Sequence, residues 1–209
     1  MNMDKLFTEF FSGHDPKQLQ AWQKAVVGIA GAGGLGSNIA LSLTRAGVGK
    51  LIIADHDSVS NANLARQQYF LNQVGLPKVT ALKDNLRRIS PYTNVTTYPL
   101  EVTPVNLESI FGQADILLEA FDAAESKQML IETWQSLYPD RYIIAASGLA
   151  GVGKNDLIHT ERLGKLILVG DGVSELEPGL SPVSARVAVV ANLQANLCLE
   201  LLLELGGDK

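Results

Sequence analysis

The stretch AVVGIAGAGGLGSNIALSLTRAGVGKLIIADHD, residues 25–57, decides the fold of this chain. Its apolar run at 25–30 predicts a buried strand, and the amphipathic residues 34–46 predict a helix. GAGGLG at 31–36 joins the two, and a second apolar run, 50–54, ends at Asp55. Strand, glycine loop, helix and strand in this order are typical of a nucleotide-binding βαβ unit.

Further apolar runs alternate with helical stretches on the C-terminal side of this unit. We expect strands at 94–99, 115–119 and 141–146, and helices at 78–89, 104–111, 123–137 and 183–205. Thr103 could cap the helix at 104, and residues 156–161 and 165–169 predict a hairpin. The predicted fold class is therefore α/β: a Rossmann-like, doubly wound, mostly parallel sheet with an antiparallel hairpin at one edge.

The length of 209 residues suits one domain, residues 1–209, with 1–24 as an N-terminal helical extension. The glycine-rich segment after residue 146 lacks periodicity, so we expect 147–165 to cross a face of the sheet as a loop. The net charge of −5 gives no electrostatic footprint for nucleic acid. We find neither a basic leader nor an apolar stretch near membrane length, and therefore predict a cytoplasmic protein without membrane contact.

The single cysteine, Cys198, excludes an intramolecular disulfide and a cysteine-ligated zinc site within one chain. It lies in the dense apolar run at 183–205, where a thiol is usually an inert packing group. We therefore expect no zinc and no cysteine chemistry.

The glycine loop carries the first candidate site. Gly31 permits the tight turn, Gly33 and its neighbour Gly34 let backbone approach a phosphate, and Gly36 allows close packing of helix and strand. Asp55 follows the second strand, where a carboxylate binds ribose hydroxyls. Nucleotide binding follows, with NAD as the default ligand at this point.

A polar segment after Asp55 changes that expectation toward ATP. It contains Asp57, Asn63 and Arg66 and leads to Lys78 at the start of a helix. Fixed cations suit transfer at phosphorus, whereas hydride transfer has little need of them. A cation at a helix N-terminus opposes the helix dipole, so a bound anion explains Lys78 better than a solvated surface lysine does.

Asp122 completes the candidate set, because it follows the strand at 115–119 on the carboxyl edge of the sheet beside the glycine loop. An aspartate there could hold magnesium or bind the nucleotide. It could instead cap the helix beginning at Ala123.

At these residues the sequence resembles the ThiF/MoeB/HesA family of ubiquitin-activating-type adenylyltransferases. The resemblance rests on GAGGLGS at 31–37, AGVGKLIIADHDSVSNANLARQ at 46–67, GLPKV at 75–79 and the acidic strand end at Asp122. The segments AASGLAGVG at 145–153 and VGDGVSELEPGLSPVSARV at 169–187 are similar to the short ThiF subgroup of thiamine biosynthesis.

The resemblance implies that the glycine loop lines ATP, that Asp55 holds ribose, and that Asn63, Arg66 and Lys78 contact the phosphates. It implies Asp122 at magnesium, with Arg66, Lys78 and Asp122 as the catalytic set. It also implies a ThiS-like sulfur-carrier protein as substrate, the 147–154 loop over its tail, and a homodimer. The activity implied is adenylation of the carrier's C-terminal glycine carboxylate.

Two departures from the family limit this transfer. The CxxC pairs of longer members are absent, and no N-terminal arginine precedes Arg45. Lys17, Lys24 or Arg186 could replace that arginine. The alternatives are a non-catalytic nucleotide-binding subunit, an NAD-dependent oxidoreductase, or adenylation of another substrate.

Overall fold

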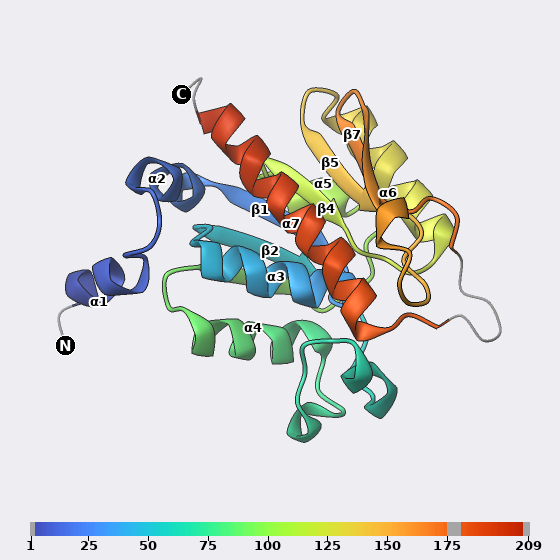
Figure 1. Cartoon of the computed structure of the whole chain (residues 1–209), viewed down its shortest axis with the longest axis horizontal. Helices are drawn as coiled ribbons and strands as arrows, with labels where there is room; N and C mark the ends of the chain where they lie inside the picture. Colours follow the sequence, from blue (N-terminus) through green and yellow to red (C-terminus); the bar gives the residue numbers. More distant parts are fainter. Residues whose placement is uncertain (1–2, 175–180, 207–209) are drawn as a thin grey trace.

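The structure is a computed structural model that describes residues 3–174 and 181–206 (Figure 1). Within these residues, seven strands form one sheet in the order β3-β2-β1-β4-β5-β7-β6. The strands are β1 (Val26–Ala30), β2 (Lys50–Ala54), β3 (Asn94–Tyr98), β4 (Ile116–Glu119), β5 (Tyr142–Ala146), β6 (His159–Leu163) and β7 (Leu166–Gly170). Every pairing is parallel except that of β6 with β7, so the predicted fold class is confirmed.

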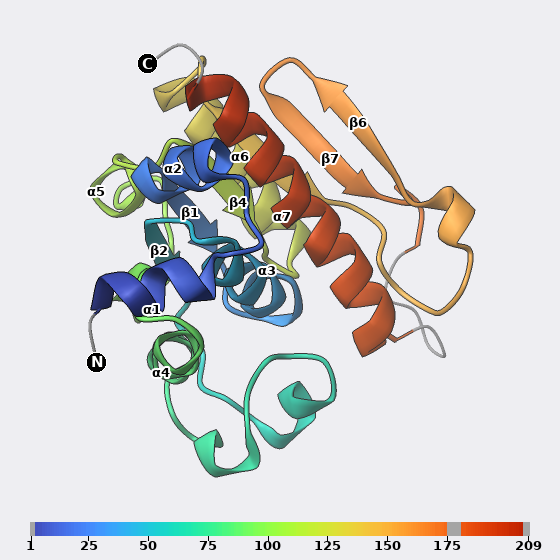
Figure 2. The same ribbon diagram turned by 60° about the vertical axis from the view of Figure 1, so that its left-hand side comes forward.

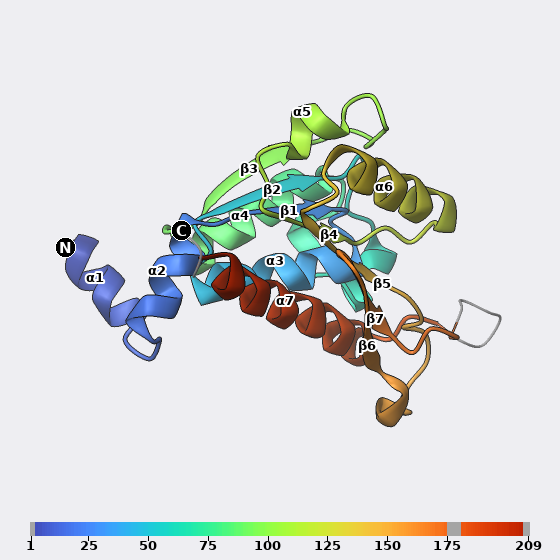
Figure 3. The same ribbon diagram turned by 90° about the horizontal axis from the view of Figure 1, so that it is seen from above.

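The α-helices of the described residues are α1 (Met3–Phe10), α2 (Pro16–Lys24), α3 (Gly34–Ala46), α4 (Lys78–Ile89), α5 (Leu107–Phe111), α6 (Ala124–Leu137) and α7 (Ser184–Gly206). Helices α3 to α7 cover the two faces of the sheet. Figure 3 shows α3, α4 and α7 on one face and α5 and α6 on the other. Two separate apolar clusters fill the two layers: one includes Ile39 and Leu82, and the other includes Phe111 and Trp134.

The two faces determine where a ligand can bind. β1 and β4 are neighbours in the sheet, yet β1 leads into α3 on one face and β4 leads into α6 on the other. The chain therefore diverges at the carboxyl ends of β1 and β4. In open α/β sheets such a switch point is where ligands bind.

Helix α7 crosses the sheet diagonally and packs against α3, as Figure 2 shows. It is long and apolar enough to span a membrane by length and composition, which corrects our expectation that no stretch approaches that length. Half of the apolar stretch of this helix is buried inside the protein. Trp22 also donates a hydrogen bond to the Leu199 carbonyl at 3.0 Å, and both observations suit a core helix. Cys198 is fully buried as predicted, and burial raises the pKa of its thiol.

The hairpin differs from the prediction in its register. Residues 164–165 form a two-residue turn, with Gly164 at φ 66°, so β6 begins at His159 and pairs Leu163 with Leu166. The segment expected at 156–161 is partly a short 3-10 turn at Asn155–Leu157. A glycine with positive φ favours this tighter connection. Strand β6 also shortens the irregular loop that we expected to reach residue 165.

The predicted helix at 104–111 begins three residues later, at Leu107. Asn106 accepts a hydrogen bond from the Thr103 backbone N–H at 2.8 Å and thereby closes a turn over residues 103–106. Thr103 therefore donates this hydrogen bond through its backbone N–H and does not cap the helix with its hydroxyl. Asp122 does not cap α6 either, because the N-cap residue is Ala123, without a side-chain hydrogen bond.

Candidate nucleotide site

The glycine loop after β1 is packed against backbone on both sides. A Cβ atom at Gly31, where φ is 105°, would lie 2.6 Å from the Ala120 carbonyl oxygen. One at Gly36 would lie 1.9 Å from the Gly31 carbonyl oxygen. Side chains are thus excluded at both positions, which fixes the loop between β1 and β4.

The other two glycines form the start of α3. Gly33 is the N-cap residue and provides no side-chain hydrogen bond, and Gly34 is the first helical residue. The first N–H groups of a helix carry partial positive charge and bind anions such as phosphate. A Cβ at Gly34 would be 3.1 Å from Val187 of α7 and 3.9 Å from the Arg66 side chain. Arg66 and the first turn of α7 therefore flank this end of the loop.

Asp55 at the end of β2 connects the loop to the polar segment. One carboxylate oxygen accepts the Ala32 backbone N–H at 2.7 Å, and the other accepts that of Asp57 at 2.8 Å. The side chain is 10% exposed. Asp55 thus orients the glycine loop, and only a small part of its carboxylate faces solvent.

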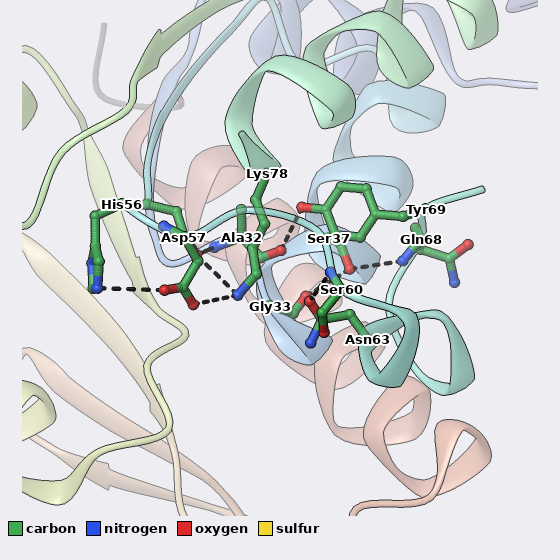
Figure 4. A network of polar contacts seen from close by, with 11 residues as sticks. Ala32, Gly33, Ser37, His56, Asp57, Ser60, Asn63, Gln68, Tyr69 and Lys78 are labelled. Carbon is green, nitrogen blue, oxygen red and sulfur yellow. Dashed lines mark hydrogen bonds and ion pairs between the residues drawn. The ribbon is translucent and has the colours of Figure 1, made fainter. Parts of the chain in front are cut away.

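Lys78 is buried beside these carboxylates (Figure 4). Its Nζ lies 2.6 Å from Asp57 and 4.0 Å from Asp55, and its side chain is only 7% exposed. The alternative of a solvated surface lysine is therefore wrong. The hydrogen bond from Lys78 and its charge lower the pKa of Asp57, with His56 contributing weakly. These acids also offset the unfavourable helix dipole, so Lys78 does not need a bound anion to be stable.

Tyr69 holds the glycine loop from the opposite side (Figure 4). Its hydroxyl donates a hydrogen bond of 2.6 Å to the Ala32 carbonyl, and the ring is buried. Burial and the charges of Asp55 and Asp57 raise the pKa of this phenol, which therefore remains protonated and donates. Both backbone polar groups of Ala32 are thus bonded to side chains.

Tyr69→Phe should loosen the glycine loop without changing any charge. The Ala32 carbonyl would lose its partner, which should lower the free energy of unfolding by about 1–3 kcal/mol and weaken the stabilisation by ATP. Urea denaturation with and without ATP measures both effects. Tyr142→Phe is the control, because Tyr142 is the first residue of β5 and so lies at the amino ends of the strands, away from the glycine loop. Equal behaviour of the two variants would contradict this role of Tyr69.

Asn63 and Arg66 lie on one 3-10 turn, Asn61–Ala65, and its C-cap residue. The Asn63 side-chain oxygen accepts the Ser60 backbone N–H at 2.9 Å, and an Arg66 guanidinium nitrogen contacts the Ala62 carbonyl at 3.3 Å. The turn is fastened to α3, because the Gln68 backbone N–H donates to the Ser37 hydroxyl (Figure 4). The Gln68 side-chain amide also donates to the Asn38 side chain. Arg66 is half-buried and lies close to Gly34.

Asp122 lies in the turn between β4 and α6 and is exposed. Its neighbour Phe121 would be 3.4 Å from a Cβ at Gly31, so the turn adjoins the glycine loop. Within the described residues, no group of three or more acids, histidines or cysteines could cage a metal. One exposed carboxylate at a phosphate loop fits magnesium, which is usually bound through one or two carboxylates and substrate phosphates.

Glu119 was not among the residues predicted for the site. It is fully buried at the end of β4 and forms an ion pair with Lys127 of α6. Burial raises the pKa of its carboxyl, while Lys127 and two backbone N–H groups oppose that rise. The sequence signal was an acid at the end of an otherwise apolar strand. A second buried polar residue, Gln194 of α7, donates to the Glu119 carbonyl at 3.1 Å.

Arg186 lies in the first turn of α7, next to Val187, and its side chain is held in a buried ion pair. It is 5% exposed, and one guanidinium nitrogen lies 2.6 Å from Asp171, while another donates to the Gly153 carbonyl. Arg186 thus ties the 147–154 segment to α7. Its charge is already paired with Asp171, which argues against it as the replacement for an N-terminal arginine.

This ion pair makes stability dependent on pH. Burial opposes ionisation of Asp171, but the N–H groups of Ser174 and Val173, and Arg186, hold the pKa of its carboxyl well below the usual 3.8. The unfolded chain therefore takes up this proton first, and the stabilisation is complete above about pH 4 and lost as the pH falls through the folded-state pKa.

Asp171→Asn should lower stability at neutral pH and make the loss of stability below about pH 4 shallower than in the unchanged chain. Urea denaturation across this pH range measures both slopes. Asp156→Asn, an exposed acid in the preceding loop, is the control. If the free energy of unfolding fell equally steeply below about pH 4 in the unchanged chain and both variants, Asp171 would not be the source of this pH dependence.

These features define a Rossmann-like domain with a candidate nucleotide-phosphate site. The site consists of the glycine loop at the switch point, the Asp55 carboxylate that holds it, and the cations Arg66 and Lys78. Comparison with known proteins then identifies the particular family. The chain belongs to the ThiF family, whose model matches residues 8–209.

Curated relatives match part of this chain. "Adenylyltransferase and sulfurtransferase UBA4" of Candida glabrata is 34% identical over 143 residues, covering 68% of this chain and 33% of the relative. "Ubiquitin-like modifier-activating enzyme 5" of Caenorhabditis briggsae is 35% identical over 112 residues, covering 48% and 26%. The chain thus spans a third or less of the length of these relatives.

Solved structures match over nearly the whole chain. E. coli tRNA N6-threonylcarbamoyladenosine dehydratase, TcdA, in complex with ATP has a TM-score of 0.86 at 21% identity, covering 97% of this chain and 96% of that one. E. coli MccB with ATP has a TM-score of 0.70 at 21% identity, covering 96% and 63%. At these identities the structures establish the shared fold.

Proposed function

We propose that this chain is an ATP-dependent adenylyltransferase that activates the C-terminal carboxylate of a ubiquitin-like sulfur-carrier protein. The observation that carries the proposal is the buried Lys78 in the hydrogen-bond network of the glycine loop, in a chain of the ThiF family. Asp55 and Asp57 hold this cation at the loop, and Arg66 adds a second one beside Gly34. Hydride transfer would not use either cation in the reaction, whereas transfer at phosphorus would use both to stabilise negative charge.

The proposed reaction is an in-line displacement at the α-phosphorus of ATP. A carrier carboxylate oxygen forms the new bond to phosphorus, the bond to the bridging oxygen breaks, and pyrophosphate leaves with the electron pair. A carboxylate is already an anion, so no general base is needed. Arg66, Lys78 and the N-terminus of α3 would stabilise the charge on the phosphoryl oxygens, and positioning would supply much of the remaining rate.

Magnesium is part of this proposal, with Asp122 as its protein ligand. When bound, it would neutralise charge on the phosphates. Asp122 is exposed at the edge of the glycine loop, so it can reach a ligand without rearrangement of the core.

We take a ThiS-like carrier as the first substrate to test. The names of the relatives also point elsewhere: UBA4 is an adenylyltransferase and sulfurtransferase, and TcdA is named for a tRNA base. None of the relatives described above is named for thiamine biosynthesis. Carrier activation is therefore the core of the proposal, and thiamine biosynthesis is its more specific form.

Mass spectrometry of the acceptor tests substrate and reaction together. A ThiS-like carrier ending in glycine, incubated with this chain, ATP and magnesium, should gain one adenylyl group. A carrier with an amidated C-terminus is the matched control and should remain unchanged. Modification of tRNA bearing N6-threonylcarbamoyladenosine, without modification of any carrier, would reject carrier activation.

One alternative is a non-catalytic subunit that binds nucleotide. It predicts stabilisation by ATP without adenylate formation. An NAD-dependent oxidoreductase predicts instead that NAD raises the melting temperature more than ATP does, because a ligand stabilises the folded state that binds it. Thermal-shift measurements with both nucleotides separate these possibilities.

A homodimer is part of the proposal. Lys17 and Lys24 line a pocket with Asp115 and Leu202, at the amino ends of β1 and β4. The glycine loop lies at the opposite ends of these strands. Either lysine could therefore serve only the site of a neighbouring subunit. Sedimentation measures the oligomeric state.

A further inference from the structure

Glu119 is the fully buried acid of β4, at the switch point of the sheet. One carboxylate oxygen accepts the Phe121 backbone N–H at 2.7 Å. The other forms the ion pair with Lys127 and accepts the Ala146 backbone N–H at 3.4 Å. A buried ion pair is weak support for stability, because packed apolar residues in its place are often equally stable. Stability alone therefore does not explain why a charged pair occupies this place.

The partners of Glu119 lead to two different parts of the proposed site. Phe121 directly precedes Asp122, the predicted magnesium ligand. Ala146 is the last residue of β5 and directly precedes the 147–154 segment. One side chain thus connects the turn next to ATP with the segment that would cover the carrier's tail.

Helix α7 also holds the ends of β4 and β5 together, from the face of the sheet opposite to α6. The buried side chain of Gln194 donates to the Glu119 carbonyl at 3.1 Å and to the Ile144 carbonyl at 3.3 Å. The ends of β4 and β5 are thereby held together by a side chain from α7 and by Glu119 itself. Because Glu119 has no exposed surface, it cannot touch a substrate and must act through its neighbours.

We propose that Glu119 is a positioning residue that fixes the position of the Asp122 turn relative to the start of the 147–154 segment. This fixed arrangement places the attacking carboxylate in line with the α-phosphorus of ATP. The kinetic part of this inference rests on the proposed function, whereas the structural coupling between the two segments does not.

Glu119→Gln tests the inference with little change in shape. The amide oxygen can still accept the Phe121 N–H, but the amide nitrogen cannot accept that of Ala146 or pair with Lys127. At saturating ATP, kcat for adenylation should fall about 10–100-fold while KM for ATP stays within about threefold, because small misplacements of reacting groups cost rate. An unchanged kcat, or a loss of kcat that merely follows a loss of folded protein, would overturn the inference.

Matched variants separate positioning from folding. Lys127→Arg keeps the ion pair and should keep kcat within about threefold, whereas the uncharged pair Glu119→Gln/Lys127→Met should fold and still lose rate. The double variant decides the question if Glu119→Gln alone does not fold. Glu132→Gln removes an exposed acid from α6, the helix that carries Lys127, and its kcat should equal that of the unchanged chain.

Amide hydrogen exchange provides a readout that is independent of activity. In Glu119→Gln, exchange should become faster at residues 120–124 and at 146–154 together, while α3 keeps its protection. Acceleration in only one segment, or in neither, would overturn the coupling. If the unchanged chain forms no adenylate, the proposed function fails, and hydrogen exchange still decides whether Glu119 couples the two segments.

Discussion

Arg66→Ala should reduce adenylate formation by about 10²–10³-fold, the range observed when one preorganised donor to a developing negative charge is removed. The aliphatic part of the Arg66 side chain lies beside Gly34 at the start of α3, where the phosphates of a bound nucleotide would lie. The guanidinium hydrogen bond within the described part of the chain is the 3.3 Å contact with the Ala62 carbonyl. The loss should therefore be in rate rather than in folding.

Stability and a matched arginine check this interpretation. The free energy of unfolding of Arg66→Ala should stay within about 0.5 kcal/mol of the unchanged chain, as for most surface substitutions. Arg45→Ala, exposed in the last turn of α3, should retain full activity. Arg66→Lys should recover only part of the rate, because an ammonium lacks the planar fork of guanidinium. Full activity in Arg66→Ala would remove Arg66 from the site.

Lys78→Met should cause a similar loss of rate, about 10²–10³-fold, for a different structural reason. Lys78 is held between Asp55 and Asp57, so its removal also leaves two acids near the glycine loop without their cation. Those charges would repel phosphate, and the affinity for ATP should fall together with kcat. Thermal shift with ATP and pre-steady-state kinetics separate the two contributions.

The control for this substitution is Lys83→Met, a half-buried lysine on the same helix. It should retain both ATP binding and rate. Lys78→Arg should not restore the rate, because the side chain is 7% exposed and the larger guanidinium would have to displace its neighbours. Wild-type activity in Lys78→Met would show that this cation serves only the fold.

The fold was predictable because its strands and helices each show their own spacing of apolar residues along the sequence. The βαβ unit at 25–57, the parallel strands and the final helix all follow from apolar periodicity and glycine placement. The register of the β6–β7 hairpin was less accessible, since it depends on which residues occupy a two-residue turn. The strands expected at 156–161 and 165–169 leave residues 162–164 between them, whereas the structure has a two-residue turn of Gly164 and Lys165.

The candidate site was predictable only where sequence order determines position. Asp55 could be placed beside the glycine loop because both follow neighbouring parallel strands. The ion pairs of Lys78, Glu119 and Arg186 could not be predicted, because their partners are joined by tertiary packing. Arg186 shows this most clearly: an arginine near a proposed site was a reasonable phosphate ligand until its partner Asp171 was located.

Exchange of labelled pyrophosphate into ATP, measured with and without a ThiS-like carrier, is the most direct test of carrier adenylation by this chain. Label should enter ATP only when carrier, magnesium and this chain are all present, and this exchange should be lost in Arg66→Ala. ATP that raises the melting temperature of the chain, but no exchange with any ThiS-like carrier tested, would contradict the claim and indicate a subunit that binds nucleotide without adenylating a carrier.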